Sequence, residues 1–252
     1  MDFRKIFNDK VTPKDFDKFR FRYCDELFAD VIAHSKLNAT KTALEIDPGT
    51  GQATEPILKT NCSYLAIELG ENFADDMKKK FNRYKNFNIV NADFETYPFE
   101  KNMFDLVYSA ATIQWIPEEI AFPKVYHILK SNGTLAMFMT HTDYRTSNEA
   151  LYEKIQDVYS QFFKPETAYT KKFDYYNAVN YGFVDFERRE YHQVKECTAD
   201  EYVSFISIYA ANLTIPEPYK SKFLNGIRNA ILSFGNKITL NNTIILYLAR
   251  KP

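Results

Sequence analysis

Short apolar segments alternate with longer segments of mixed polarity through the first half of the chain. Five of the apolar segments are rich in β-forming residues and end in polar turns: Ala43–Ile46, Tyr64–Ile67, Asn88–Val90, Leu106–Ser109 and Leu135–Thr140. The segments between them are long enough for helices. This alternation predicts an α/β fold with a mostly parallel sheet, in which ligands bind beyond the carboxyl ends of the strands.

The pattern changes after Thr140. Residues 149–163 carry apolar and aromatic side chains along one stripe, which predicts a packing helix. Strand-like segments return at Phe183–Val194 and Thr243–Ala249, and two helical segments, Asp200–Ala211 and Tyr219–Phe234, lie between them. We interpret the later helices as a lid over the sheet.

The charge balance restricts the class of partner. Lys and Arg total 32 and Asp and Glu total 33, so the net charge of -1 gives no overall field that would hold nucleic acid or an anionic membrane. No run of roughly 18 uncharged apolar residues is present to span a bilayer. We therefore expect a cytoplasmic protein with a small-molecule partner and with neither nucleic acid nor a membrane as partner.

The cysteines give no sign of a metal site. Cys24, Cys62 and Cys197 are odd in number and widely spaced, and they lack the paired spacing with histidine that zinc sites show. We expect reduced, structural thiols and no metal.

A glycine-containing turn follows the first predicted strand. Asp47-Pro48-Gly49-Thr50-Gly51-Gln52 leads from this strand into a helix near Gln52. The two glycines allow backbone N–H groups and a ligand to approach closely. A tight turn that binds no ligand would have the same pattern, so the turn alone does not decide.

Two acidic residues follow the next two predicted strands. Glu68 comes directly after Tyr64–Ile67, where a carboxylate can accept hydrogen bonds from both hydroxyls of a ribose. Asp93 follows the third strand, where it could accept a hydrogen bond from the exocyclic amine of adenine while Phe94 covers the ring. Beside the glycine turn, these acids indicate a nucleoside site.

A dinucleotide-dependent dehydrogenase is the main enzymatic alternative, because Glu68 lies 68 − 51 = 17 residues after Gly51. The third glycine of that fingerprint is replaced by Thr54. A ligand without a pyrophosphate is therefore favoured.

These motifs resemble the class I S-adenosylmethionine (SAM) methyltransferases, in the branch that includes the trans-aconitate and malonyl-carrier-protein O-methyltransferases. The similar segments are Leu44–Gly51, Ala66–Leu69, Asn91–Asp93, Phe104–Ala110 with Gln114-Trp115, Ile128–Leu135 and Leu246–Arg250. The resemblance implies a Rossmann-like, seven-stranded, mostly parallel sheet with an antiparallel last strand and a helical lid. It implies a single domain with N-terminal cofactor-covering helices in 1–35, a SAM-binding core in 40–140, a lid in 141–181 and 198–236, and C-terminal strands in 183–194 and 243–250.

The resemblance also implies a set of site residues. Gly49 and Gly51 would line the methionine and ribose of SAM, Glu68 would hold the ribose, and Asp93 with Phe94 the adenine. Arg20 is the candidate partner of the SAM carboxylate, since a guanidinium binds a carboxylate bidentately, and Arg22 competes for this role. The remaining cofactor-binding candidates are Glu45, Asp47, Leu69, Ser109 and Ala110. The product would be S-adenosylhomocysteine.

Asp47 departs from the family pattern, because most relatives carry a glycine there. Its carboxylate could bind the ammonium of SAM or repel its carboxylate, and the sequence leaves the sign open. We therefore keep a second hypothesis, a catalytically silent binding or regulatory protein with the same fold. Asn132 also replaces a usual glycine, a mild change because Asn tolerates positive φ.

The methyl acceptor is not readable from the sequence. A carboxylate acceptor needs only donors that orient it, such as Gln114 and the Trp115 indole, whereas an amine or alcohol would need a base, for which His141 is the best placed histidine. Nucleic-acid modification is a third hypothesis, disfavoured because the chain lacks a basic stripe and an Asn-Pro-Pro-aromatic motif. The oligomeric state, monomer or homodimer, stays open.

Overall fold

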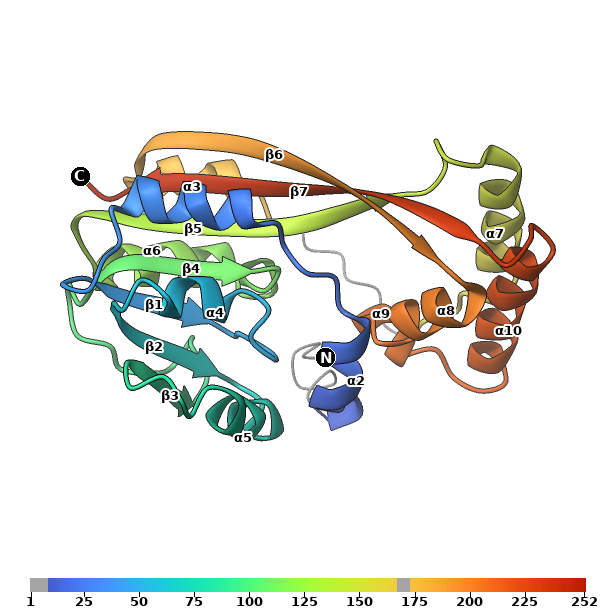
Figure 1. The fold of residues 1–252 in the computed structure, drawn as a ribbon, viewed down its shortest axis with the longest axis horizontal. Helices are drawn as coiled ribbons and strands as arrows, with labels where there is room; N and C mark the ends of the chain where they lie inside the picture. The colour runs from blue at the N-terminus through green and yellow to red at the C-terminus, as the bar shows by residue number, and fades with distance from the viewer. Residues whose placement is uncertain (1–8, 167–172) are drawn as a thin grey trace. The chain divides into compact units, whose positions relative to one another are not determined.

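A computed structural model describes residues 9–166 and 173–252 of the chain. These residues form a seven-stranded sheet. The strand order is β3-β2-β1-β4-β5-β7-β6 (Figure 1). The strands are β1 Thr42–Ile46, β2 Ser63–Glu68, β3 Phe87–Asn91, β4 Phe104–Ala110, β5 Leu129–Asp143, β6 Val184–Cys197 and β7 Ile238–Arg250. Strands β1 to β5 pair in parallel and the last strand is antiparallel, which confirms the predicted fold class.

Strand β5 is longer than the sequence pattern indicated. The sequence pattern begins this strand at Leu135, yet Asn132 already donates its N–H to the carbonyl of Lys251 (2.8 Å), and the N–H of Lys251 donates to the carbonyl of Gly133 (2.9 Å). Asn132 adopts φ 62°, and the β4–β5 register shifts between Phe104 and Leu106. Backbone pairing with Lys251, the residue after β7, therefore keeps this irregular segment in the sheet.

Alternate residues of the strands face two separate apolar layers. Ala43 and Tyr108 belong to the layer formed with α3 (Asp25–Ser35), α4 (Thr54–Leu58) and α5 (Glu71–Lys80). Leu44 and Val107 belong to the layer formed with α6 (Glu118–Ile128). Since successive side chains of a strand point to opposite faces, a continuous apolar run such as Ala43–Ile46 is what a sheet covered on both faces requires.

The chain divides into two compact units. The larger contains the described parts of 21–139, 172–191 and 244–252, and the smaller those of 1–20, 140–171 and 192–243. The unit boundaries therefore cut through the predicted N-terminal segment 1–35 and the predicted lid 141–181. Residues 1–8 and 167–172 of these two segments lie outside the described residues.

Helices make up most of the smaller unit. They are α2 Pro13–Phe19, α7 Glu149–Phe162, α8 Ala199–Ser207, α9 Ala210–Leu213 and α10 Tyr219–Leu232. Helix α10 packs against α7 and α8. Gly226 permits the close approach, because a Cβ there would lie 2.7 Å from Cγ1 of Val158. The helices predicted after Thr140 are thus confirmed, with a break between α8 and α9.

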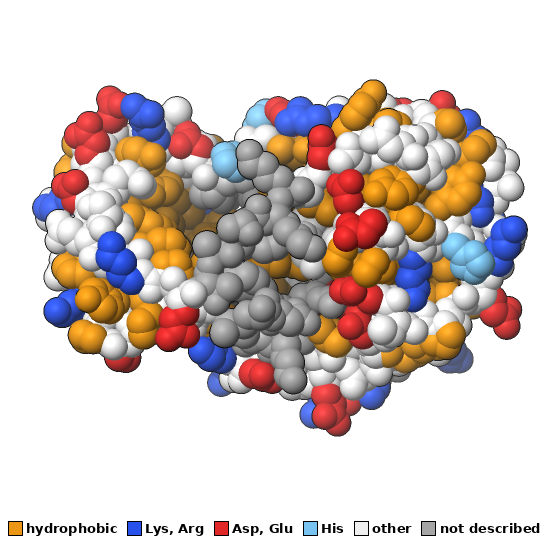
Figure 2. All heavy atoms as spheres, turned by 180° about the vertical axis from the view of Figure 1, so that it is seen from behind, with side chains coloured by type: hydrophobic (Ala, Val, Ile, Leu, Met, Phe, Trp, Pro, Cys, Tyr) orange, Lys and Arg blue, Asp and Glu red, His pale blue; other side chains and the backbone are white. Residues whose placement is uncertain are grey.

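Charged side chains are mixed with apolar ones on the face that Figure 2 presents. Within residues 9–166 and 173–252, no helix has both the length and the apolar character needed to cross a membrane. Over the same part of the chain, no cluster of three or more His, Cys, Asp or Glu side chains is arranged to hold a metal ion.

Candidate functional site

The turn after β1 forms a cradle, by which we mean residues 47–53. Three of its residues have positive φ: Asp47 (47°), Gly49 (60°) and Gly51 (78°). The N–H of Asp47 donates to the carbonyl of Ile67 (2.8 Å), and that of Gly51 to the carbonyl of Pro48 (3.0 Å). The first bond joins the cradle to β2, so the predicted turn lies at the carboxyl edge of the sheet.

Gly51 is required by helix packing. A Cβ at this position would lie 2.5 Å from Cε2 of Phe81 and 2.8 Å from Sδ of Met77. Lys80 also donates to the carbonyl of Thr50 (2.7 Å). The glycine that the sequence assigns to ligand approach thus lets α5 and the residue after it support the cradle from one side.

Glu68 connects the cradle to the loop after β2. Its Oε2 accepts from the N–H of Gly49 (3.0 Å) and its Oε1 from that of Gly70 (2.8 Å). The side chain is buried. Burial and the nearby charge of Asp47 raise the pKa of Glu68 to about 8, although the two hydrogen bonds act to lower it. A carboxyl with so high a pKa at a strand end is a candidate functional group.

Glu45 lies beneath the cradle rather than at its surface. It is fully buried, and its Oε2 accepts hydrogen bonds from the hydroxyls of Thr54 (2.6 Å), Tyr108 (2.8 Å) and Tyr64. Burial raises the pKa of Glu45 despite these bonds. The predicted cofactor contact of Glu45 is not supported by this placement, because the side chain supports the first turn of α4 instead.

The end of β3 brings Asp93 next to the end of β2. Asn91 donates its Nδ2 to the carbonyls of Glu68 (2.9 Å) and Leu69 (3.0 Å), and the N–H of Ala92 donates to the carbonyl of Glu68 (3.0 Å). Glu68 and Asp93 are therefore brought to one edge, as predicted. Phe94 is fully buried and packs against Phe99 (5.9 Å between ring centroids), so it belongs to the core and does not present a free face to a ligand.

The loop after β4 lies on the other side of the cradle. Thr112 donates its hydroxyl to the carbonyl of Asp47 (3.4 Å). Ser109 is fully buried, and its hydroxyl accepts from the N–H of Ile113 (3.0 Å), so it shapes this loop rather than lining a pocket. Ala110, the last residue of β4, and Trp115, in the short helix η1 (Ile113–Trp115), are half-buried.

Gln114 is held at both ends of its amide. Its Nε2 donates to the carbonyl of Ala111 (2.8 Å), and its Oε1 accepts from the hydroxyl of Tyr175 (3.2 Å). Tyr175 is stacked on Tyr247, with ring centroids 4.4 Å apart. No local pattern in the sequence could identify Tyr175, because it lies 61 residues from Gln114.

Arg20 and His141 belong to the smaller unit. Arg20 follows α2 and lies over the ring of Phe16 (5.6 Å), while His141 is exposed on β5. Their assignments to the cofactor carboxylate and to a base stay predictions.

The larger unit therefore assembles most of the predicted set at a single edge. The sheet order reverses beside β1, which has β2 on one side and β4 on the other, and ligands bind at such a switch point in α/β sheets. Its acids suit a ligand that carries hydroxyl donors, an amine and positive charge. SAM has all three, so the residues present fit this cofactor.

Comparison with known proteins agrees with this fit. A family model described as "Methyltransferase domain" matches residues 44–137. The chain is 29% identical to malonyl-[acyl-carrier protein] O-methyltransferase 1 of Ilyobacter polytropus over 133 residues, which is 52% of the chain and 46% of that protein. It is 35% identical to ribosomal RNA small subunit methyltransferase A of Dehalococcoides mccartyi over 71 residues, 28% of the chain and 24% of that protein. The chain thus spans less than half the length of these two curated relatives in the matched regions.

A solved structure shows the same fold. Phosphoethanolamine N-methyltransferase 2 of Haemonchus contortus, solved with S-adenosylhomocysteine and phosphomonomethylethanolamine, aligns with a TM-score of 0.60 at 18% identity. The alignment covers 100% of this chain and 60% of that one. At this identity the likeness concerns the fold.

Proposed function

We propose that this chain is a class I SAM-dependent methyltransferase that binds SAM at the cradle and methylates a small molecule, which its methyltransferase-domain match and its fold support. The observation that carries the proposal is the buried Glu68 carboxylate, which links the amides of Gly49 and Gly70 at the switch point. When bound, SAM supplies a methyl group activated by a sulfonium.

Glu68 has the capacity to hold a ribose. A carboxylate offers about four lone-pair sites, and the two backbone amides use one on each oxygen. The ionised form of Glu68 would then keep one site on each oxygen for the two hydroxyls of a ribose diol. The amides meanwhile fix the orientation of the carboxylate, so no rotamer freedom is lost on binding.

The charges of the cradle favour a cationic ligand. Asp47 and Glu68 lie close enough for the charge of one to raise the pKa of the other. A positive charge placed between the loops that carry them would favour the ionised form of Glu68. We infer that Asp47, in the position of the usual glycine, supports binding of the cationic cofactor rather than opposing it.

The proposed acceptor is a small molecule, with a carboxylate as the simplest case. Methyl transfer to a carboxylate requires alignment and no base, and Gln114 has an amide fixed by Ala111 and Tyr175 that suits this role. Trp115 and His141 are the further candidates. The net charge of -1 and the mixed charges of Figure 2 support a small molecule over RNA, although one relative named above is a ribosomal RNA methyltransferase.

Calorimetric titration with SAM, S-adenosylhomocysteine and NAD⁺ tests the proposal. We expect the first two ligands to bind and NAD⁺ not to bind, because the third glycine of the dinucleotide fingerprint is Thr54, whose hydroxyl is bonded to Glu45. Absence of SAM and S-adenosylhomocysteine binding at millimolar concentration would refute it.

A catalytically silent binding protein is the second candidate, because Asp47 introduces a side chain at φ 47° where most relatives have glycine. Incubation with methyl-labelled SAM and a panel of carboxylic acids and amines separates the two. Label in any acceptor supports the enzyme, whereas tight SAM binding with no transfer to any acceptor favours the silent protein.

A further inference from the structure

Lys124 of α6 holds the loop that begins with Asp93. Its Nζ donates to the carbonyls of Glu95 (3.0 Å) and Tyr97 (2.6 Å). The side chain is half-buried and comes from a different element of the larger unit than the loop that it holds. An ammonium that bonds two carbonyls of one short turn fixes the position of that turn.

The same turn closes around Asp93. The N–H groups of Thr96 (3.2 Å) and Tyr97 (2.9 Å) donate to the carbonyl of Asp93, and the N–H of Glu95 donates to its Oδ1 (2.9 Å). These bonds make the direction of the Asp93 carboxylate depend on the backbone of residues 95–97. Lys124 bonds that backbone at both ends.

Aromatic rings and acidic side chains surround the ammonium group of Lys124. Its Nζ lies over the rings of Phe94 (5.4 Å) and Phe99 (5.7 Å), and Phe94 is fully buried. Burial lowers the pKa of Lys124, while the charges of Asp93 and Glu95 act in the opposite direction. The ammonium therefore lies within electrostatic reach of the Asp93 carboxylate.

We propose that Lys124 is a positioning residue that aims the Asp93 carboxylate and thereby selects a 6-aminopurine over a 6-oxopurine in the cofactor. This inference rests on the proposed function, in which Asp93 meets the adenine. An ionised carboxylate only accepts hydrogen bonds, so it matches the amine of adenine and repels the carbonyl oxygen of hypoxanthine. Without Lys124 the loop relaxes, and Asp93 loses the direction on which this choice depends.

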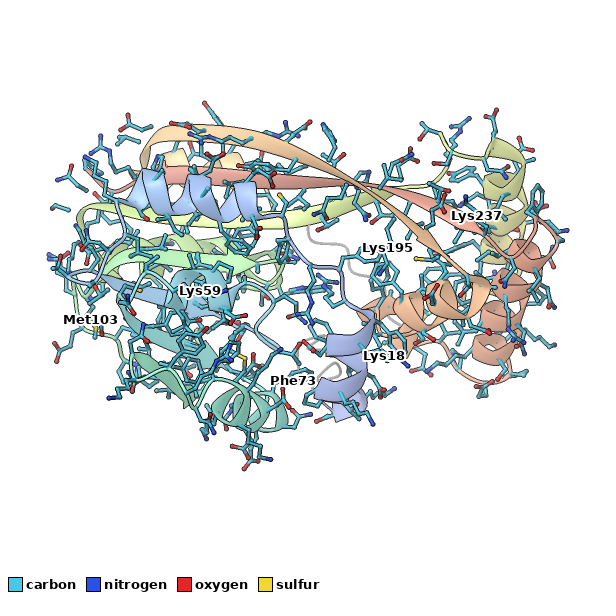
Figure 3. All side chains as sticks on the ribbon, viewed as in Figure 1. Lys18, Lys59, Phe73, Met103, Lys195 and Lys237 are labelled. Carbon is cyan, nitrogen blue, oxygen red and sulfur yellow. The ribbon has the colours of Figure 1, made fainter. Side chains whose placement is uncertain are left out.

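The test measures dissociation constants for S-adenosylhomocysteine and its 6-oxo analogue, S-inosylhomocysteine. In Lys124→Met we expect the preference for the adenosyl ligand to fall about tenfold, through weaker adenosyl binding, because one oriented hydrogen bond to a charged group is lost. Lys124→Arg, which keeps the charge and the donors, should recover the preference to within about threefold. Lys59→Met, an exposed lysine at the end of α4 (Figure 3), is the control and should change neither constant.

A double-mutant cycle separates positioning from general loosening. Asp93→Asn should itself reduce the preference, and adding Lys124→Met to it should have no further effect on the ratio, since the two residues act in series. Equal weakening of both ligands by Lys124→Met, or additive effects with Asp93→Asn, would overturn the inference. If Lys124→Met does not fold, Lys124→Gln and the arginine variant provide the same comparison.

Failure of the proposed function gives a different result. If the natural chain binds neither ligand, both proposals fail. If it binds S-adenosylhomocysteine and the ratio does not respond to Lys124, the proposed function stands and only this inference is wrong.

Discussion

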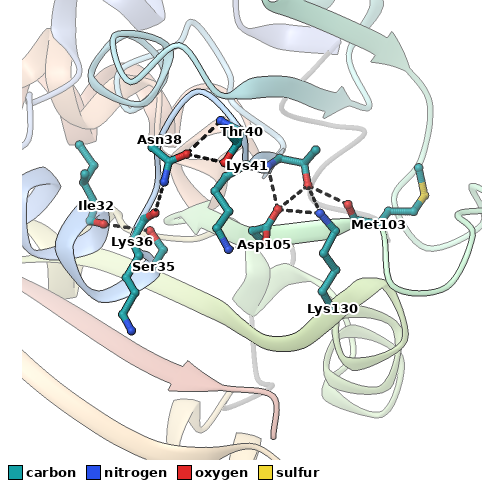
Figure 4. A network of polar contacts seen from close by, with 10 residues as sticks. Ile32, Ser35, Lys36, Asn38, Thr40, Lys41, Met103, Asp105 and Lys130 are labelled. Atoms are coloured by element: carbon teal, nitrogen blue, oxygen red, sulfur yellow. Dashed lines mark hydrogen bonds and ion pairs between the residues drawn. The ribbon is translucent and has the colours of Figure 1, made fainter.

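The two edges of the parallel sheet each hold a buried acid, and the pKa of the acid is lowered at one edge and raised at the other. At the amino edge, Asp105 of β4 accepts from Lys130 (2.7 Å), Lys41 (2.9 Å) and the N–H of Thr42 (2.9 Å), in the network of Figure 4. Burial alone would raise its pKa, but these bonds hold the pKa of Asp105 at about 2. At the carboxyl edge, Glu68 accepts from two backbone amides and has a pKa of about 8.

This difference supports the proposed position of the ligand at the carboxyl edge. At the amino edge the protein itself supplies the cations beside its carboxylate, because ion pairs join Asp105 of β4 to Lys130 of β5 and to Lys41, the residue before β1. At the carboxyl edge the described contacts of Glu68 supply hydrogen bonds without a full positive charge. Perturbed acids of this kind are more typical of binding sites than of structural ion pairs.

Removal of Glu68 should have the largest effect. Glu68→Ala should weaken S-adenosylhomocysteine binding about 100-fold, since two hydrogen bonds to a charged acceptor are lost at about 1.5 kcal/mol or more each. Calorimetry on this variant and on Glu71→Ala, an exposed acid in the first turn of α5, gives the comparison. A change below threefold in Glu68→Ala would show that the ribose lies elsewhere.

Thr54 should matter for stability. Thr54→Gly introduces the glycine of the dinucleotide fingerprint but removes the hydroxyl that donates a hydrogen bond to Glu45. It also places glycine in a helix, so we expect the free energy of unfolding to fall by about 2 to 3 kcal/mol. Thr54→Ser keeps the hydroxyl and should lose less. Urea denaturation measures both variants, and equal losses would mean that the bond to Glu45 contributes little.

Asp105→Asn should lower the free energy of unfolding by about 1 to 2 kcal/mol at pH 7. The value is modest because both lysine partners are more than one-third exposed. The pKa of Asp105 is lowered on folding, so its contribution is present above its ordinary value of 3.8 and is lost as the pH falls toward 2. Denaturation curves at pH 7 and pH 3 should therefore show a smaller difference between variant and natural chain at pH 3. A difference that is independent of pH would contradict the ion-pair explanation.

The smallest expected effect is that of Asp47→Asn, and it has the opposite sign. Because the pKa of Glu68 is raised on folding, the stability linked to its proton is present below the ordinary value of 4.5 and is lost as the pH rises through about 8. Removing the Asp47 charge should lower that folded pKa and stabilise the fold by about 1 kcal/mol at pH 9, with no change near pH 6. Stability measured from pH 6 to pH 9 checks this, and destabilisation at pH 9 would refute it.

Sequence patterns predicted the strands and the acids that follow them, because these depend on local periodicity and on one turn. They did not reveal that Glu45, Phe94 and Ser109 are fully buried, and for Glu45 the reason is a set of partners as distant as Tyr108. The alternation of side chains along the strands gives one signal for the position of Glu45. Tyr64 and Tyr108 lie on the same face of the sheet as Glu45, in the two strands that pair with β1. Lys124 and Tyr175 had no such signal, because their roles depend on tertiary contacts alone.

A crystal structure grown with S-adenosylhomocysteine tests the central claim most directly. We expect the ribose hydroxyls on the Glu68 carboxylate, the adenine amine on Asp93 and the homocysteine beside Asp47, between the loops after β1 and β4. Ligand bound at any other place, or a cradle without ligand at saturating concentration, would contradict the account.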